Sequence, residues 1–427
     1  MLFLRVLKKK IIFLSLAVNF SANYTIDNAH FYRAAYFWGE PRLEQDWLFS
    51  ADTSVGFSST RTSRNSSNEK TPLLNLFGPF NMQDLGKNLP NLDPNSKLDK
   101  ILIDLQNLPD NDEFGHLEFD AKFSMVEGVV SLYQNFTNGF FCQAYLPIRK
   151  LKINNISYKD LSPTNGQEPN ESNPVWQEFL SSFDEITNKY GIDMHASKNS
   201  GAGDLSLLLG WTINYQETTH VDYVDISSKI GVLFPTGKTK NENKPFELPT
   251  GYNGYYGLPV FVQGSFGSFE WLTLGGHVGA LFFYEKTKKL RVKTAAEQNG
   301  LIKLAQELVQ VDPGTIWTFG SYIKADHISA GLSALCGYSF NKKENDTLFL
   351  KNPADSTTTN LIINSDPLYH GWNMHVLNLL VEYDFAYDPN KLGWRLGLFY
   401  NRILAGKRVF NAQVKAFNIG LDAILSW

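Results

Sequence analysis

Cysteine, charge and long apolar runs are all scarce in this chain of 427 residues. The two cysteines, Cys142 and Cys336, are far apart and lack metal-ligand spacing, so we expect neither a disulfide framework nor a cysteine-bound metal. No run of about 18 apolar residues follows the N-terminus, which argues against helical membrane spans. Charged residues make up 19% of the chain with a formal net charge of -4, so nucleic acid is not an expected partner.

Motifs for nucleotide or metal chemistry are missing as well. The sequence has no glycine-rich nucleotide loop before a helix and no His-Glu-any-any-His, so we expect no cofactor and no metal. Aromatic residues, in contrast, are abundant: they make up 14% of the chain, with 31 Phe and 19 Tyr. Many rings and few charges are typical of membrane-spanning β-barrels, whose rings lie at the membrane interfaces.

The N-terminal segment has the layout of a secretory signal. Arg5 and Lys8 to Lys10 precede an apolar stretch from Ile11 to Val18, and Ser21 and Ala22 follow. We expect a signal peptide over residues 1–22 and a periplasmic N-terminal segment over 23–46. Phe20 stands where a small residue is usual, so an uncleaved anchor remains an alternative.

Strict alternation of apolar and polar residues dominates the rest of the chain, as expected for strands between lipid and a lumen. The pattern predicts an all-β fold, a transmembrane antiparallel barrel of about twelve strands over residues 47–427. The alternating segments are 47–57, 117–125, 140–148, 205–215, 224–234, 258–266, 272–284, 317–325, 328–340, 377–385, 394–400 and 417–427.

The connections between these segments alternate in length. Short turns such as Asn138-Gly139 and Asp388-Pro389 predict the periplasmic side, and long connections predict outer loops at about 63–115, 159–200, 237–254, 286–313 and 342–369. Three amphipathic helices are expected inside the loops: one after Ser96, one after Asn173-Pro174, and one from Ala295 to Val309. The apolar segment Thr71 to Gly86 is expected either to constrict the lumen or to pack on the rim.

The last segment alternates apolar residues up to Leu421, Ala423, Leu425 and the terminal Trp427. A final strand that ends on an aromatic residue resembles the assembly signal of bacterial outer-membrane β-barrels. This resemblance implies an outer-membrane location, with the lipid bilayer and the barrel-assembly machinery as partners, and it makes Leu421, Ala423, Leu425 and Trp427 the assembly signal.

Strand parity selects the charged residues that should face the lumen, and it points both cysteines toward lipid. The lumen set contains acids and bases together, so it predicts a channel lining without strong charge selectivity, or alternatively a salt-bridge network that stiffens the wall. Apolar members such as Tyr145, Leu208, Leu233, Leu380 and Phe399 suggest a partly apolar interior. The charged set is Asp52, Glu118, Asp120, Lys122, Arg149, Asp225, Lys229, His277, Lys324, Glu382, Asp384, Arg395 and Asp422.

Two further resemblances bear on function. Gly201 to Leu205 and Phe234 to Gly237 are similar to segments of the fatty-acid and phenol-pathway outer-membrane transporters, although that group has more strands. His195-Ala196-Ser197 resembles the His-any-Ser of outer-membrane phospholipase, but Lys198-Asn199 departs from its pattern. We therefore predict a non-enzymatic channel for passive passage of small solutes, hydrophobic or aromatic ones included. A lipid-modifying enzyme and a closed barrel that binds a partner through its outer loops are the alternatives.

Overall fold

The computed structural model describes residues 47–108, 115–161, 173–216, 221–268, 271–329, 331–354, 356, 358–385 and 393–424. The expected signal peptide over 1–22 and the segment 23–46 lie outside these residues. So do Leu425 and Trp427 at the end of the predicted assembly signal.

Twelve antiparallel strands close into a barrel, which confirms the predicted fold class. The first strand of the barrel pairs with the last, from Leu48 opposite Ile424 to Ser58 opposite Val414, and this pairing closes the sheet. Around the barrel the strands are β5 (His116–Asn135), β1 (Leu48–Thr60), β20 (Gln413–Ile424), β18 (Gly393–Lys407), β17 (Asn373–Asp384), β15 (Leu332–Lys343), β14 (Ile316–Ser329), β11 (Leu272–Phe283), β10 (Gly257–Ser268), β9 (Tyr223–Phe234), β8 (Leu205–Gln216) and β6 (Phe140–Asp160).

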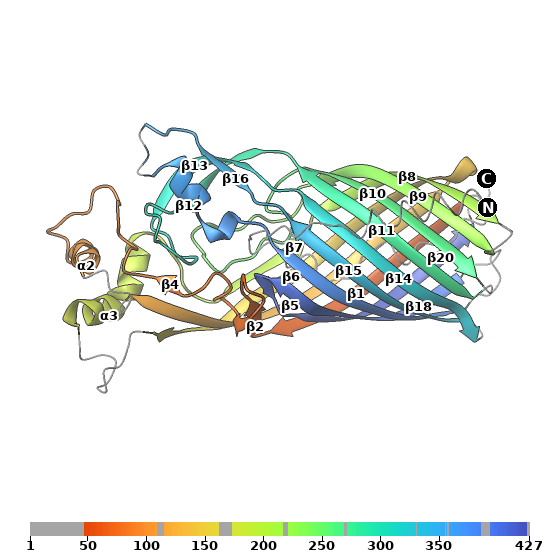
Figure 1. Cartoon of the computed structure of the whole chain (residues 1–427), viewed down its shortest axis with the longest axis horizontal. Coiled ribbons are helices and arrows are strands. Elements are labelled where there is room, and N and C mark those ends of the chain that lie inside the picture. The colour runs from red at the N-terminus through yellow and green to blue at the C-terminus, as the bar shows by residue number, and fades with distance from the viewer. Residues whose placement is uncertain are drawn as a thin grey trace, which may run out of the picture.

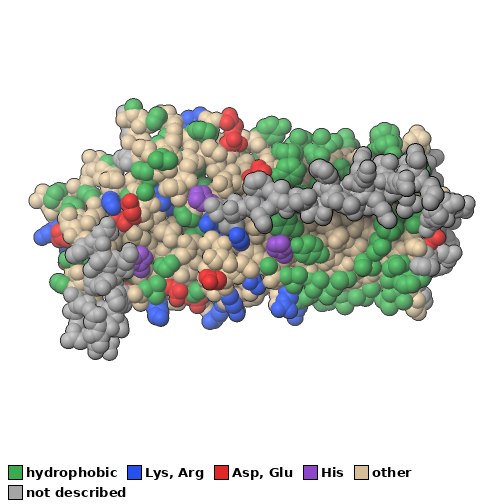
Figure 2. Space-filling model, viewed as in Figure 1, with side chains coloured by type: hydrophobic (Ala, Val, Ile, Leu, Met, Phe, Trp, Pro, Cys, Tyr) green, Lys and Arg blue, Asp and Glu red, His purple; other side chains and the backbone are tan. Residues whose placement is uncertain are grey.

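The outer face of the barrel is a belt of exposed apolar side chains. In water such a continuous surface would be a strong aggregation site, whereas against acyl chains it is the expected lipid-facing surface. Figure 2 shows hydrophobic side chains gathered over the strand half of the molecule and charged ones over the other half. Members of the belt include Phe57, Leu209, Ile230, Ile323, Leu398 and Phe417.

The connections are separated by length between the two ends of the barrel (Figure 1). At one end, which we call the turn end, lie the short connections, the start of β1 and the end of β20. Asn138 and Gly139 there adopt positive φ values of 60° and 78°, the conformation that tight turns between strands require. The opposite end, the loop end, carries the long connections.

Two of the three predicted loop helices form. They are α2 (Lys97–Gln106) and α3 (Pro174–Lys189), which pack against each other at the far tip of the molecule. Asn173 caps α3, because its side chain accepts the N–H groups of Val175 and Trp176. The third predicted helix, over 295–309, is wrong. Residues from Ala305 onward form a strand that pairs with two other loop strands. Among the described residues, no helix is long and apolar enough to span a membrane.

Smaller strands tie the loops together. One sheet joins β12 (Lys286–Val292), β13 (Ala305–Asp312) and β16 (Thr347–Leu350), and a second joins β2 (Thr62–Arg64), β3 (Lys70–Pro72) and β19 (Val409–Phe410). β4 (Phe80–Asn81) pairs with β5, and β7 (Ser197–Ala202) pairs with β6. The short helix α4 (Asn360–Asn364) and the 3-10 turns Thr137–Gly139 and Pro367–Tyr369 complete the elements of the part of the chain that the structure describes.

Candidate functional site

Ten of the thirteen charged residues predicted to face the lumen lie on the inner face of the barrel. Each alternates along its strand with outward side chains, such as Trp394 and Leu396 on either side of Arg395. Seven of the ten lie near the turn end, Lys229 and His277 lie near mid-height, and Arg149 lies toward the loop end. The ten are Asp52, Arg149, Asp225, Lys229, His277, Lys324, Glu382, Asp384, Arg395 and Asp422.

The other three, Glu118, Asp120 and Lys122, lie on the outer face of β5, so their predicted lumen position is wrong. They share the face of exposed Val126 and Leu132, while the residues between them, among them Phe119, are buried inward. The cause is the length of β5, whose 20 residues extend past the belt on the loop side. Beyond the belt the outer face meets water and the inner face packs under the loops, which reverses the apolar side.

A charged network near the turn end is centred on Arg395. Its Nε lies 2.7 Å from Asp422 Oδ2, and its Nη2 lies 3.2 Å from Asp52 Oδ1. Nη2 also donates to Ser50 Oγ at 3.0 Å, and Nη1 lies 3.7 Å from Glu382 Oε1. One guanidinium therefore bridges β1, β17 and β20 from β18, which stiffens this part of the wall.

A second polar group lies nearby on β9, β11 and β14. Lys324 Nζ lies 2.5 Å from Asp326 Oδ1, and Thr273 donates to Asp326 Oδ2 at 3.2 Å. With Asp225, Asp384 and the Arg395 network, the described residues of the inner face near the turn end include six carboxylates against two basic groups. Acids therefore predominate in this vestibule. Asp326 was not predicted because it lies just beyond the predicted strand 317–325. Ser50 and Thr273 were not predicted because only charged residues were considered.

Aromatic rings of the inner face lie flat on the wall because glycines stand opposite them. Tyr322 is the cross-strand partner of Gly275, and a Cβ on that glycine would overlap the tyrosine ring. His277 lies in the same way over Gly320. The pairs Phe141–Gly210, Phe261–Gly279 and Tyr223–Gly267 repeat the arrangement. A ring folded onto the wall does not extend toward the barrel axis, so these pairs clear space in the lumen.

The loop end is closed by an apolar core, which we call the cap. The segment Thr71 to Gly86 supplies Leu73, Leu74, Leu76 and Phe80, all at most 1% exposed. They belong to one continuous cluster with inward residues of the barrel strands: Met125, Leu233, Leu281, Ile316, Met374, Val376, Ile403 and Val414. Since these strands surround the mouth, the loops fill it from within. Within this cluster Phe80 packs against Phe119, and β4 pairs with His116 and Leu117 in the part of β5 that extends past the belt, so these contacts of the segment lie at the rim, the second of the two placements considered from the sequence.

A buried ion pair holds the cap to the wall. Arg149 Nε lies 2.5 Å from Glu127 Oε2, and Arg149 Nη1 donates to the carbonyl oxygen of Thr250 at 2.8 Å. Thr250 belongs to the loop between β9 and β10, so the guanidinium links β5, β6 and that loop. The side chain of Glu127 points inward, as every second side chain of β5 does. It was not predicted, because the alternation in β5 was read with the other set of side chains facing the lumen.

The groups of the enzyme alternative have other partners. The hydroxyl of Ser197 is buried and donates to the carbonyl oxygen of Phe246 at 2.9 Å. His195 is largely exposed, and its Nδ1 lies 2.9 Å from Asp193 Oδ1. A serine nucleophile needs its hydroxyl free to pass a proton to the histidine, so this arrangement argues against a His–Ser pair.

No family model and no curated protein matches this chain. Solved structures do match its architecture. An outer membrane channel from Pseudomonas putida F1 covers 90% of this chain and 99% of its own, at 9% identity and a TM-score of 0.49. The translocator domain of the autotransporter NalP from Neisseria meningitidis matches at 9% identity and 0.36, covering 90% of each chain. The toluene transporter TodX from Pseudomonas putida matches at 8% identity and a TM-score of 0.29, covering 94% of each chain. These TM-scores are all below 0.5, so the fold assignment rests on the strand pairing of this chain itself.

Proposed function

We propose that this protein is a passive outer-membrane channel for small apolar solutes, with the cap as its outer gate. The exposed apolar belt around a closed sheet supports a place in the bilayer, spanned by strands. The expected N-terminal signal and C-terminal assembly strand support the outer membrane as the location. With this orientation the turn end faces the periplasm and the loop end faces outward.

The observation that carries the channel proposal is the order of apolar and polar environments along the axis of the barrel. The cap at the loop end is apolar, the wall below it holds its rings flat against glycines, and the turn end is a polar vestibule. The arrangement favours a path along the axis whose resistance lies in the cap.

The chemistry of the cap favours apolar solutes over hydrated ones. A sugar or ion that entered it would lose water contacts without gaining hydrogen bonds, which costs several kcal/mol for each polar group by rough transfer values. An apolar solute would exchange contacts with leucine and phenylalanine for similar ones. Once past the cap it would leave through the vestibule, where carboxylates outnumber basic groups and should give a weak preference for cations.

The test is permeability of the reconstituted protein before and after the cap is loosened. In the variant Leu73→Ser, Leu74→Ser, Leu76→Ser, the segment loses its buried apolar contacts, so conductance in planar bilayers and sugar uptake into liposomes should rise. The matched control is Leu308→Ser, Phe349→Ser, Leu361→Ser, three exposed loop residues, and it should behave as the wild type. The wild type should pass small aromatic hydrocarbons better than sugars.

Two results would overturn the proposal. If neither the wild type nor the cap variant passes any solute although both are folded and inserted, the result supports the alternative of a closed barrel that binds a partner. If the wild type instead releases fatty acid from phospholipid and Ser197→Ala abolishes that release, the lipid-modifying alternative holds.

A further inference from the structure

Four lysines gather on the outer face of the barrel just beyond the apolar belt. Lys152 on β6 stands directly opposite Lys198 on β7, and Lys150 follows on the same face, opposite Ser200. Lys122 on β5 stands opposite Asn154, beside the position of Lys152. All four are exposed or half-exposed, and among the described residues none has a carboxylate at salt-bridge distance.

Like charges in direct cross-strand positions repel, so this patch costs stability unless an anion lies over it. The acidic groups of this face lie farther along β5. Asp120 comes beyond Lys122, and its Oδ1 accepts the N–H of Ala121. Glu118 accepts a hydrogen bond from the side chain of Asn75 at 3.2 Å. Both carboxylates keep their charge, but neither lies at salt-bridge distance from a lysine of the patch, so the four ammonium groups at the edge of the membrane-facing surface have no direct carboxylate partner among the described residues.

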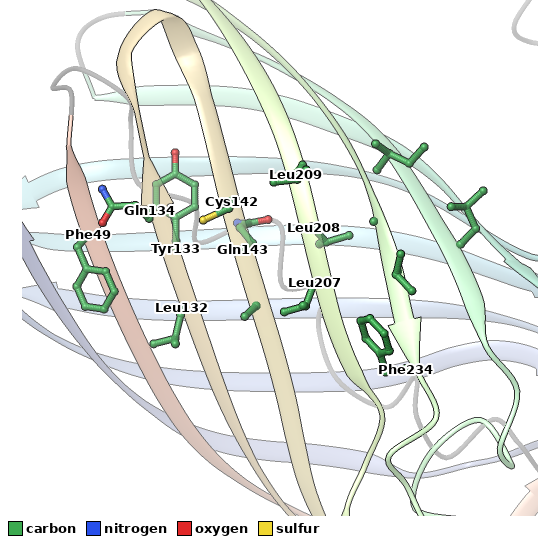
Figure 3. Close-up of a pocket in the computed structure, with 15 residues that line it drawn as sticks. Phe49, Leu132, Tyr133, Gln134, Cys142, Gln143, Leu207, Leu208, Leu209 and Phe234 are labelled. Atoms are coloured by element: carbon green, nitrogen blue, oxygen red, sulfur yellow. The ribbon is translucent and has the colours of Figure 1, made fainter.

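An apolar groove of about 850 Å³ lies on the same strands, deeper in the belt (Figure 3). Its floor is formed by the small side chains of Cys142 and Ala144 on β6. Taller leucines flank them: Ala144 is the cross-strand partner of Leu132 on β5 and of Leu207 on β8. The alternation of these outward residues with inward ones places the groove on the lipid side of the wall.

The outward residues of β6 connect the groove to the lysines. Leu146 and Ile148 lie between Ala144 and Lys150, so an apolar strip runs from the groove up to the patch. Six residues of strand rise about 20 Å. At a tilt of about 45° this is roughly 14 Å of depth, close to the ~15 Å of one leaflet of the hydrocarbon core. The spacing matches a lipid whose acyl chain lies in the groove and whose headgroup reaches the lysines.

We propose that this face binds a phosphorylated lipid of the outer leaflet, with its phosphate on Lys122, Lys150, Lys152 and Lys198 and an acyl chain in the groove of β5, β6 and β8. The inference rests on the proposed place of the barrel in the outer membrane. Ammonium groups bind phosphate as point charges, and the groove supplies the contact that a free phosphate cannot use.

The test is lipid retention by the full-length protein in nanodiscs, measured by native mass spectrometry and by competition with phosphatidic acid against phosphatidylcholine. Wild type should retain phosphatidic acid preferentially. Binding should be more than about tenfold weaker in the quadruple variant Lys122→Gln, Lys150→Gln, Lys152→Gln, Lys198→Gln. The charge-matched control removes four exposed loop lysines and should still retain phosphatidic acid; it is the quadruple variant Lys70→Gln, Lys97→Gln, Lys100→Gln, Lys289→Gln.

A substitution in the groove distinguishes binding of a lipid from binding of a free phosphate. Ala144→Phe fills the floor without entering the core, so it should weaken phosphatidic acid binding, and glycerol 3-phosphate should not displace the bound lipid. Equal loss in the lysine variant and its control, or full displacement by glycerol 3-phosphate, would overturn the inference. A protein that inserts and conducts but shows no lipid preference refutes this inference alone, whereas failure to insert refutes the proposed function.

Discussion

Glu127 and Arg149 form an ion pair in which both side chains are at most 4% exposed, at the level where the cap meets the barrel wall. Their arrangement couples a loop to the lumen, because Arg149 also holds the carbonyl oxygen of Thr250. Opening the cap requires this loop to move, so the pair is placed to oppose opening.

We expect Arg149→Met to destabilise the folded barrel and to raise its permeability. Removing one partner of a buried pair leaves the other charge unpaired, at a cost of about 3–5 kcal/mol. The midpoint of urea unfolding should fall, and bilayer conductance should rise. In the double variant Glu127→Gln, Arg149→Met the unpaired charge is gone, so part of the lost stability should return. Equal stability of single and double variants would argue against the pair as the cause.

The contact between α2 and α3 should depend on pH through Asp99. Burial acts to raise the pKa of Asp99, but hydrogen bonds from Lys189, the Asp93 N–H and Tyr190 outweigh it and leave this pKa below its ordinary value. A lowered folded pKa adds stability that is fully present above the unfolded pKa of about 3.9 and is lost as the pH falls through the folded one.

Hydrogen exchange of α2, corrected for intrinsic rates, checks this expectation. Wild-type α2 should exchange slowly at neutral pH and faster below about pH 4. Asp99→Asn should exchange faster already at neutral pH and change little in acid. Asp104→Asn, a partly exposed position on the same helix, is the control and should follow the wild type.

The barrel could be predicted from the sequence because alternation is a local property of each strand. All twelve strands were found, since each carries its own two-residue pattern. The pattern does not say which side is the lumen, and it failed for Glu118, Asp120 and Lys122 because β5 extends out of the belt and its apolar face is covered by loops. The point at which β5 leaves the apolar belt can be located only once the folded position of the loops is known.

Contacts between distant segments were beyond sequence reasoning. The predicted helix from Ala295 to Val309 overlaps β13, because residues 305–309 pair with strand β12 on one side and Val309 pairs with β16 on the other. The cap joins segments that are hundreds of residues apart. The flat rings of Tyr322 and His277 depend on glycines of a neighbouring strand, so neither could be found without the register.

Both cysteines should be reachable from lipid but not from water. Cys336 is exposed and Cys142 half-exposed on the outer face of their strands. In native membranes an uncharged maleimide should label them, and a charged thiol reagent should not. Ser265→Cys in a cysteine-free background places a thiol on the inner face near the vestibule and should react with the charged reagent. Fast charged labelling of Cys336 would place that strand outside the bilayer.

The assembly signal remains a prediction from the sequence, because Trp427 lies outside the described residues. If the terminal aromatic is read during assembly, Trp427→Ser should lower the amount of folded protein in the outer membrane. Trp394→Ser, an exposed tryptophan of the outer face on β18, is the matched control and should leave that amount nearly unchanged. Equal levels in both variants would remove Trp427 from the signal.

The rings that lie on glycines give the sharpest test of a path through the lumen. Alanine at Gly275 or Gly320 would overlap the ring of Tyr322 or His277, so the ring must turn off the wall toward the axis. In the cap-loosened background, where the cap no longer limits flow, Gly275→Ala and Gly320→Ala should each reduce conductance by roughly half or more. Gly264→Ala is the control, because its Cβ would point outward with its nearest atom, the carbonyl oxygen of Asp225, 3.9 Å away. Unchanged conductance in folded Gly275→Ala and Gly320→Ala would mean that solutes do not pass these rings, and the proposed axial path would fail.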